Sequence, residues 1–436
     1  MSENKDTAHM HPFEPDMLGV EDALERILAL LKPNELQEKD ILDTLGLTLG
    51  EKIYAPFDMP QVPDSAMDGY AVRFQDTAAA TENSPVFLNV IGEIAAGGVS
   101  NISLEPRTAI KIMTGAPIPK NATAVVPFEL TDELDRKTNI VKQDKIGIFE
   151  AAGKGNNIRP SGENFRSGDL ILDKNTLLRP SEIGILATIG KSRAMVVRRP
   201  VIGVLATGNE LSALGQSLKP GQIYDSNTYS IAAAIAKIGG IAKIIGIAKD
   251  TFQDTEQKIL SGLDTDMLIS SAGVSKGDYD IVKDVMAMHG NINFWSIRMR
   301  PAKPLAFGLL SSVNGTMTPL IGLPGNPVSA MVAFEEFCRP AILKLMGRVN
   351  FQRPVIEATL KNTIYNNDNR RVFARVFVTR TITGFDATLT GAQGSNLLTS
   401  MSRANGLAIC PEDISVLNVG EMVKVKMIDW PEDELL

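Results

Sequence analysis

Apolar and polar positions alternate with two different periods along this 436-residue chain, and each change of period marks a different kind of element. From 20 to 31 the apolar side chains recur at helical spacing, which predicts an amphipathic helix that ends at Lys32-Pro33. Between 54 and 141 short apolar runs are separated by Gly, Pro and Asn turns, which indicates a small β-rich domain. The predicted strands there are 86–91, 109–113 and 123–128.

From Pro180 to about residue 346, short apolar segments alternate with segments of helical period. This alternation is typical of a parallel sheet covered by helices on both faces. The predicted strands are 201–206, 243–247, 266–270, 293–297 and 319–323. The predicted helices are 226–238, 251–263, 279–289 and 327–346, several beginning at a residue that favours the N-cap position. We therefore expect a Rossmann-like, doubly wound α/β domain.

After Gly347 the helical period disappears, and strands are predicted at 355–360, 372–379, 385–390, 407–409 and 422–427. The fold class expected is thus multidomain α/β, with β-rich N-terminal parts and a C-terminal β-barrel-like domain. The expected parts are a linker or dimerisation domain (17–53 and 142–180), a β-rich domain (54–141), an α/β domain (181–347) and a C-terminal β-domain (348–436).

Composition narrows the possible functions. The 44 Lys and Arg residues against 51 Asp and Glu give a formal net charge of −7, which argues against a general electrostatic grip on nucleic acid. The two cysteines, Cys338 and Cys410, lack paired spacing, so neither a disulfide framework nor a thiolate metal site is expected. We interpret 1–16 as a disordered leader rather than a signal peptide, and expect a cytoplasmic protein that does not enter a membrane.

Polar residues follow each predicted strand of the α/β domain, at the sheet edge where ligands bind in open α/β folds. Small residues with free backbone N–H groups in two of these loops suit a phosphate or oxyanion. Arg300 and Lys303 can supply the balancing positive charge. The small-residue candidates are Ser270, Ser271, Gly273, Ser275, Pro324, Gly325 and Asn326. The alternative for any one loop is a tight turn with no ligand.

Four carboxylates lie at or near the same edge: Glu210, Asp225, Asp250 and Asp280. Oxygen ligands of this kind suit Mg²⁺ bound to a phosphorylated substrate. For Asp225 and Asp250 the alternative is a helix N-cap or a surface acid, which is the more frequent role of a loop aspartate.

Several motifs are missing from the sequence. Neither the dinucleotide-binding pattern G-x-G-x-x-G nor the P-loop pattern occurs at a strand-to-helix junction, which disfavours an ordinary NAD or NTP enzyme. The only histidines are His9, His11 and His289. The chain therefore offers almost no histidines from which a serine–histidine triad or a histidine zinc site could be built. The chemistry is therefore expected to be electrostatic positioning.

Two segments of the β-rich part carry weaker signals. The run 63–71 presents Asp68 next to a glycine, and the run 113–117 presents the hydroxyl of Thr114 in a turn. Taken alone, either segment is better explained by turn formation.

Together these segments resemble the molybdopterin molybdenumtransferase family, the bacterial MoeA proteins, which are related to the E domains of animal gephyrin and its plant counterpart. The resemblance runs from about Val20 to Met427, and a series of motifs in this order is highly specific. Its landmarks are 65–71, 113–117, 206–211, 222–227, 270–275, 300–308, 323–329 and 393–395.

The resemblance implies an enzyme that inserts molybdate into adenylyl-molybdopterin and releases AMP, with molybdenum held by the dithiolene sulfurs of the pterin. It implies an elongated homodimer in which Asp68 and Thr114 reach the partner subunit's cleft. It further implies that Glu210, Asp250 and Asp280 handle Mg²⁺ or molybdate. Residues implied near the anionic ligand are Arg300, Lys303, Arg370, Arg375 and Ser395. Molybdopterin adenylyltransferase and molybdoenzyme maturation proteins are the implied partners.

The sequence departs from the family pattern near the implied anion site. Ala272 and Ala302 stand where glycine is usual, Ser296 where some relatives have lysine, and Arg300 in place of lysine. The added methyl groups would narrow the approach to phosphate, and the loss of a lysine would weaken anion attraction. Two alternative functions remain open: a noncatalytic molybdopterin-binding carrier or scaffold, and molybdopterin adenylyltransferase. The flanking domains argue against the second.

Overall fold

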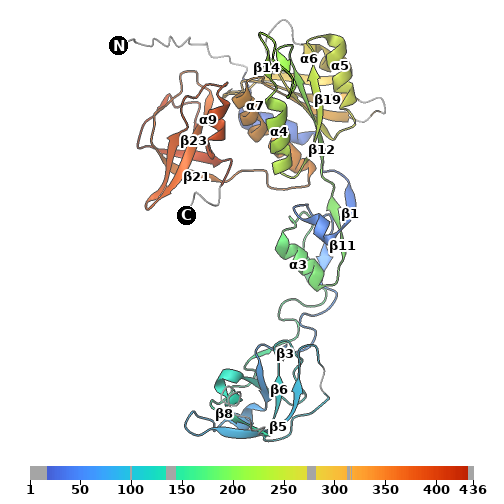
Figure 1. Cartoon of the computed structure of the whole chain (residues 1–436), viewed down its shortest axis with the longest axis vertical. Helices are drawn as coiled ribbons and strands as arrows, with labels where there is room; N and C mark the ends of the chain where they lie inside the picture. The colour runs from blue at the N-terminus through green and yellow to red at the C-terminus, as the bar shows by residue number, and fades with distance from the viewer. Residues whose placement is uncertain are drawn as a thin grey trace. The chain divides into compact units, whose positions relative to one another are not determined.

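The computed structural model describes residues 17–98, 101–133, 144–272, 281–311, 315 and 317–430 (Figure 1). Its contacts divide the described chain into two compact units. The first comprises the described residues within Met1–Gly50, Asn175–Ile183 and Arg193–Leu436, and the second comprises those within Glu51–Lys174 and Gly184–Ser192.

The second unit is built on a five-stranded sheet whose interior strand β4 (Gly69–Val72) is buried on both faces. The strand order in this sheet is β7 (Ala124–Pro127), β4, β6 (Thr108–Ile112), β5 (Val86–Ile94) and β8 (Lys145–Ile148). The apolar runs predicted as strands therefore form β5, β6 and β7. All four residues of β4 are buried, because Tyr70 and Val72 enter one apolar cluster and Ala71 the other. Short strands β2 (Ile53–Tyr54), β3 (Asp64–Ser65), β9 (Ile158–Arg159) and β10 (Leu170–Leu172) pair beside this sheet.

The central element of the first unit is a six-stranded sheet. Its order is β15 (Ile241–Ala248), β12 (Val201–Thr207), β16 (Met267–Ser271), β20 (Met317–Leu323), β19 (Pro304–Ser311) and β17 (Gly290–Ser296). The first four strands are mutually parallel, as predicted. Since β19 is antiparallel to both of its neighbours, β17 runs in the same direction as the parallel strands.

Strand β19 is the element of this sheet that the sequence pattern did not predict. Its residues Pro304–Ser311 overlap the 300–308 motif, for which no strand was predicted. The strand is almost continuously buried, and only residues 312–316 separate it from β20 in the sequence. Antiparallel neighbours can be joined by a short connection, whereas parallel neighbours need a crossover of about a dozen residues or more, which is why this pair is antiparallel.

Helices cover both faces of the sheet, as a doubly wound fold requires (Figure 1). On one side α4 (Asn227–Lys237) and α7 (Pro327–Ala333) pack with α1 (Val20–Ala29) in a large apolar cluster. On the other side α5 (Phe252–Ser261) and α6 (Ile281–His289) enclose a second cluster with Leu205, Leu268 and Leu320. After α7 the helix continues as a π-helical turn, Phe334–Cys338, and then as α8 (Arg339–Leu345), which together fill the predicted helix 327–346.

The C-terminal residues form a closed five-stranded barrel, which confirms the barrel-like prediction. Its order is β23 (Arg371–Thr381), β24 (Gly384–Leu389), β21 (Val355–Leu360), β27 (Met422–Met427) and β25 (Gly406–Cys410), closed by pairing of β25 with β23. Strand β18 (Met299–Arg300), which lies between β17 and β19 of the α/β sheet in the sequence, pairs with β23. The helix α9 (Leu398–Ser402) and the pair β22 (Ile364–Tyr365) and β26 (Val416–Leu417) complete this part.

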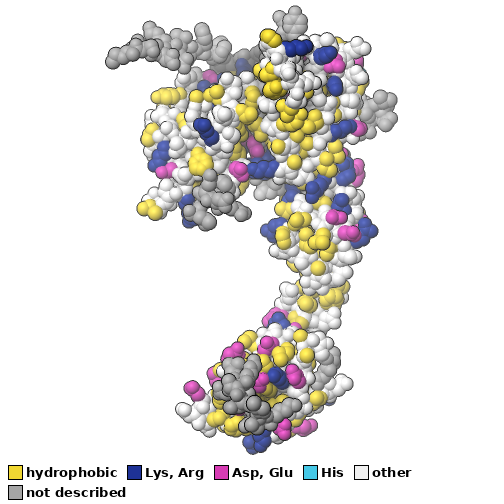
Figure 2. All heavy atoms as spheres, viewed as in Figure 1, with side chains coloured by type: hydrophobic (Ala, Val, Ile, Leu, Met, Phe, Trp, Pro, Cys, Tyr) yellow, Lys and Arg dark blue, Asp and Glu magenta, His cyan; other side chains and the backbone are white. Residues whose placement is uncertain are grey.

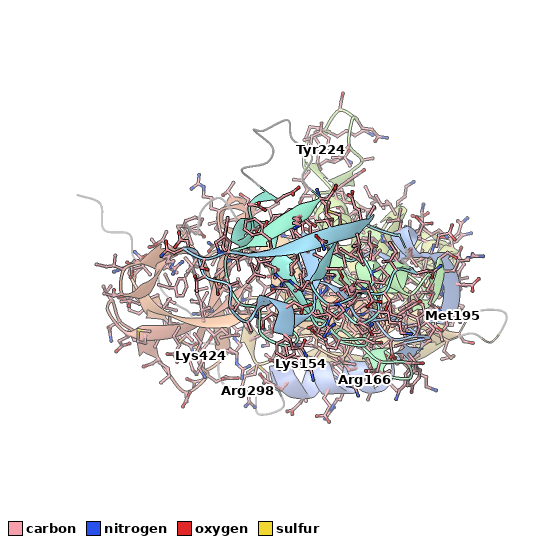
Figure 3. All side chains as sticks on the ribbon, turned by 90° about the horizontal axis from the view of Figure 1, so that it is seen from below. Lys154, Arg166, Met195, Tyr224, Arg298 and Lys424 are labelled. Atoms are coloured by element: carbon pink, nitrogen blue, oxygen red, sulfur yellow. The ribbon has the colours of Figure 1, made fainter. Side chains whose placement is uncertain are left out.

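The remaining elements of the first unit are small. Strands β1 (Leu36–Asp40) and β11 (Arg193–Val197) pair antiparallel, and β13 (Leu211–Ser212) pairs with β14 (Ile223–Tyr224). Tyr224, which is labelled in Figure 3, is half exposed and donates a hydrogen bond to the Gln216 carbonyl at 2.8 Å. Helix α3 (Pro180–Thr188) begins in the first unit and continues, from Gly184, in the residues assigned to the second.

The surface carries charges of both signs. Basic and acidic side chains both occur on the face shown in Figure 2. Exposed ion pairs of the protein include Arg193 with Glu38 and with Asp40. Within the described ranges, no helix combines the length and the apolar character needed to cross a lipid bilayer.

Candidate functional site

A pocket of about 540 Å³ lies in the first unit, where loops of the α/β sheet meet loops of the barrel. From the sheet come Ala272 after β16, the segment 300–304 around β18, and the loop 324–326 between β20 and α7, with Ser329 of α7. The barrel contributes Arg370, Gln393 and Ser395. The structure therefore brings together seven of the residues predicted to bind an anion. They are Arg300, Lys303, Pro324, Gly325, Asn326, Arg370 and Ser395.

Three basic side chains give this pocket its positive character: Arg300, Lys303 and Arg370. Arg300 lies at the end of β18, where its guanidinium donates a hydrogen bond to the Tyr365 carbonyl. Arg370 lies immediately before β23 and donates to the carboxylate of Asp368, through Nε at 3.0 Å and also through Nη2. The same carboxylate oxygen lies 3.6 Å from Arg300 Nη1.

The floor of the pocket is set by hydrogen bonds between loop ends. The Asn227 amide, at the start of α4, donates to the Ser271 hydroxyl at 2.6 Å and to the Gly325 carbonyl at 2.8 Å. Ser270 and Ser271 are buried at the end of β16, so they lie behind the pocket and do not line it. Among the described residues, Ser270 Oγ and Asn227 Oδ1 are buried without a hydrogen-bond partner. Buried polar atoms of this kind are uncommon and mark sites of strain or ligand binding.

The two alanines that replace glycine both line this pocket and both have left-handed backbone conformations. The φ angle of Ala272 is 75° and that of Ala302 is 76°. A side chain costs roughly 1–2 kcal/mol in this region, which is why glycine is usual there. A Cβ added at Gly325 would lie 3.3 Å from the Ala272 Cβ. The methyl group of Ala272 therefore already fills the space between the end of β16 and the loop that contains Gly325.

Glu210 and Asp250 follow neighbouring parallel strands at the same sheet edge. The Asp250 carboxylate accepts a hydrogen bond from the Asn209 backbone N–H at 3.0 Å, and the Asn209 side chain accepts one from the Asp250 N–H. The Glu210 carboxylate folds over Gly208, where an added Cβ would lie 2.5 Å from both of its oxygens. Asp225 is buried, and its carboxylate accepts a hydrogen bond from the Thr228 N–H at the start of α4. This is the helix-capping role that was the alternative to a metal-binding role for Asp225.

Three predicted site residues, Gly273, Ser275 and Asp280, lie outside the described residues. Within the described part of the chain, no group of three or more His, Cys, Asp or Glu side chains is placed to hold a metal ion. The metal role of Glu210, Asp250 and Asp280 therefore stays a prediction.

Arg375 is a predicted anion-binding residue that does not line the pocket. Its side chain is only 1% exposed and donates to the Ser400 hydroxyl at 3.1 Å and to the Gly394 carbonyl at 3.0 Å. Burial lowers the pKa of its guanidinium to about 10. The backbone of the same residue is bound by the Gln393 amide, whose oxygen accepts from the Arg375 N–H at 2.8 Å. Arg375 thus fixes the loop that carries Gln393 and Ser395 to the pocket wall.

Asp68 and Thr114 lie in the second unit and are in direct contact. One Asp68 carboxylate oxygen accepts from the Thr114 backbone N–H at 2.7 Å and from its hydroxyl at 2.8 Å. These two hydrogen bonds, the backbone one first, lower the pKa of the exposed Asp68 carboxyl below its ordinary value. The position is fixed by Gly69, because a Cβ there would lie 2.1 Å from the Val126 carbonyl oxygen on the neighbouring strand.

Sequence reasoning did not identify Asp368, Asn227 or Gln393 as site residues. Asp368 could have been found by its position two residues before Arg370, since short acid–base pairs of this kind often orient an arginine. Asn227 and Gln393 lie within stretches that carry the family resemblance, but only the fold shows that they tie two loops together.

Models of known protein families match most of the chain. Residues 18–190 match the MoeA N-terminal region (domain I and II), residues 203–344 match a "Probable molybdopterin binding domain", and residues 357–428 match the MoeA C-terminal region (domain IV). These three matches cover the second unit, the α/β sheet and the barrel in turn.

Individual relatives agree with these matches. The chain is 36% identical over 394 residues to molybdopterin molybdenumtransferase 2 of Mycobacterium tuberculosis, covering 87% of this chain and 92% of that protein. It is 33% identical over 425 residues to the molybdopterin molybdenumtransferase of Nostoc, covering 95% of each chain. Among solved structures, a molybdopterin biosynthesis MoeA protein from Pyrococcus horikoshii superposes with a TM-score of 0.77 at 31% identity, over 95% of this chain and 100% of that one.

Proposed function

The chain belongs to the molybdopterin molybdenumtransferase (MoeA) family, and we propose that it completes molybdenum cofactor synthesis by inserting molybdate into adenylyl-molybdopterin with release of AMP. In this reaction the phosphoanhydride bond of the substrate is cleaved, AMP leaves, and molybdenum becomes bound by the dithiolene sulfurs of the pterin.

The observation that carries the proposal is the basic pocket between the α/β sheet and the barrel. Its volume of about 540 Å³ is within the range of small-molecule sites. Arg300, Lys303 and Arg370 converge on it, and they supply charge and hydrogen-bond donors suited to a pyrophosphate. The pocket also lies at the carboxyl edge of the parallel strands, where open α/β sheets bind ligands.

The side chains of this protein suit a reaction in which the substrate supplies the ligands of molybdenum. Both cysteines are buried, and burial raises the pKa of the Cys338 thiol well above its ordinary value, so this thiol does not ionise at neutral pH. His289 lies against Glu256 at 2.6 Å, between α5 and α6. The role of the protein is therefore to neutralise the charge of the pyrophosphate, to orient molybdate, and to hold the phosphoanhydride bond in one position.

We further propose that Glu210, Asp250 and Asp280 bind Mg²⁺. The donor set fits a hard cation, because carboxylate oxygens are its preferred protein ligands and Glu210 and Asp250 follow adjacent parallel strands. Bound Mg²⁺ would supply Lewis-acid polarisation of a phosphoryl oxygen. The Asn209 backbone N–H orients the Asp250 carboxylate, and the absence of a side chain at Gly208 leaves room for the Glu210 carboxylate that lies over it.

The proposed active form is a cytoplasmic homodimer. Asp68 and Thr114 belong to a different compact unit from the basic pocket, and we assign them to the partner subunit's cleft. The Thr114 hydrogen bonds leave one Asp68 oxygen available to a ligand. The proposed partners of the homodimer are molybdopterin adenylyltransferase, which would supply the substrate, and molybdoenzyme maturation proteins, which would receive the product.

AMP release from adenylyl-molybdopterin by the purified full-length protein tests the function. We expect release that requires both molybdate and Mg²⁺. Tight binding without release would assign a carrier or scaffold instead, and formation of adenylyl-molybdopterin from molybdopterin and ATP would assign an adenylyltransferase.

A further inference from the structure

Asp368 is a carboxylate placed directly behind two of the three cations of the pocket. It lies between β22 and β23 with 16% of its side chain exposed, and it does not line the pocket. Its Oδ2 accepts from Arg370 and lies 3.6 Å from Arg300 Nη1. In the described part of the chain, its Oδ1 is buried without a hydrogen-bond partner.

This arrangement makes Asp368 a competitor of any anionic ligand. A carboxylate and a phosphate oxygen use the same guanidinium N–H donors, so a ligand at the pocket must share Arg300 and Arg370 with Asp368. The buried, unpartnered oxygen shows that Asp368 has unused capacity to accept a hydrogen bond. The Asp368 carboxylate therefore contacts the two arginines from one side, and the pocket lies on their other side.

Backbone carbonyls hold the same two arginines in place independently of the ligand. Arg300 donates to the Tyr365 carbonyl, and Arg370 Nη1 donates to the Met299 carbonyl at 3.4 Å. Asp368 is consequently not the only group that orients the guanidinium groups. Its distinct contribution is its negative charge, which offsets one of the three positive charges that face the ligand.

We propose that Asp368 sets the affinity of the pocket for anions by offsetting part of its positive charge. The reduced charge weakens the binding of phosphate groups, so that the anionic product can leave after cleavage. The identity of the substrate in this inference rests on the proposed function, whereas the competition for Arg300 and Arg370 depends only on the contacts of Asp368.

The test compares Asp368→Asn with the wild-type full-length protein by calorimetric titration with inorganic pyrophosphate and with AMP. The asparagine keeps the size and an acceptor oxygen but removes the charge. We expect the dissociation constant of each anion to fall about three- to tenfold at low salt, because one nearby negative charge is removed. The gain should shrink as the salt concentration rises, since exposed charges are screened. An unchanged or larger dissociation constant would overturn the proposal.

Two further variants control for folding and for nonspecific charge effects. Asp368→Glu keeps the charge, so it should bind pyrophosphate like the wild type, and a gain like that of the asparagine variant would also overturn the proposal. Asp386→Asn removes the same charge from the same barrel, where Asp386 pairs with Lys361 at 2.8 Å, and it should leave pyrophosphate affinity unchanged.

The two proposals fail separately. If pyrophosphate binds more tightly to Asp368→Asn but neither protein releases AMP from adenylyl-molybdopterin, the charge competition stands and the transferase function does not. If the wild type releases AMP but Asp368→Asn binds pyrophosphate no better, the function stands and the role of Asp368 does not.

Discussion

Asp68 Oδ1 accepts hydrogen bonds from both the backbone N–H and the hydroxyl of Thr114, at 2.7 and 2.8 Å. The two residues lie 46 positions apart in the sequence and meet because their loops adjoin the paired strands β4 and β6. This contact keeps an exposed carboxylate ionised and fixes its direction. A charged group at a loop tip that is oriented in this way suits a role in recognising a ligand.

Thr114→Val should raise the pKa of Asp68 toward its ordinary value, because the variant removes the hydroxyl donor and keeps the backbone donor. The pKa of this carboxyl is lowered in the folded protein. Its hydrogen bonds therefore stabilise the fold above the ordinary pKa of 3.8, and this stabilisation is lost as the pH falls through the lowered pKa. NMR titration of the Asp68 carboxyl carbon measures the shift. Thr131→Val, which alters a hydroxyl bound to the Phe128 carbonyl, serves as the control and should leave the Asp68 titration unchanged.

Arg375→Met should raise the KM for adenylyl-molybdopterin about tenfold, because the loop of Gln393 and Ser395 loses its buried anchor. The change in stability should be smaller than about 2 kcal/mol, since relief of a buried charge offsets the lost hydrogen bonds. Steady-state kinetics and thermal unfolding measure the two effects. Arg380→Met, on the exposed part of the same strand, should change neither quantity, and equal losses in both variants would contradict this role.

Glu182→Gln should destabilise the protein at neutral pH by roughly 1–3 °C in thermal midpoint. Hydrogen bonds from Arg179 lower the pKa of the Glu182 carboxyl to about 2 from an ordinary value of 4.5. The contribution of the Glu182 carboxylate to the stability of the fold is therefore fully present above pH 4.5 and disappears as the pH falls toward 2. Thermal unfolding of both proteins across this range should show converging midpoints, and a difference that grows on acidification would refute the assignment.

Much of the fold is visible in the sequence because its strands are short apolar runs and its helices have regular spacing. The strands β12, β15, β16 and β20 are examples, each filling the segment predicted for it. Strand β19 escaped prediction because its residues overlap a motif of ligand-binding character, and a motif of that kind suggests a loop. The pairing that defines it is tertiary.

The candidate site was only partly predictable, for a physical reason. Residue type indicates that Arg300 and Arg375 are cationic, but not that the first lines the pocket while the second is buried behind it. That distinction depends on tertiary packing, which buries Arg375 against the Ser400 hydroxyl and the Gly394 carbonyl. The alanines at 272 and 302 were identified as departures from the family pattern, whereas their left-handed backbone is known only from the structure.

Mixed dimers test whether the second unit of one subunit completes the pocket of another. Asp68→Ala and Glu210→Ala are each expected to lose most of their activity. Co-expressed subunits that carry one change each should recover about a quarter to a half of wild-type AMP release per mixed dimer, because one of its two sites is then intact. A confirmed mixed dimer without activity would show that Asp68 and Glu210 act within the same subunit.

The most direct test of the central claim measures AMP release and molybdenum incorporation in the same single-turnover reaction with adenylyl-molybdopterin and molybdate. We predict equal amounts of AMP and of pterin-bound molybdenum, appearing at the same rate. AMP release without molybdate incorporation, or incorporation that proceeds while the adenylyl group stays attached, would contradict the assignment of this protein as the molybdenum-inserting enzyme.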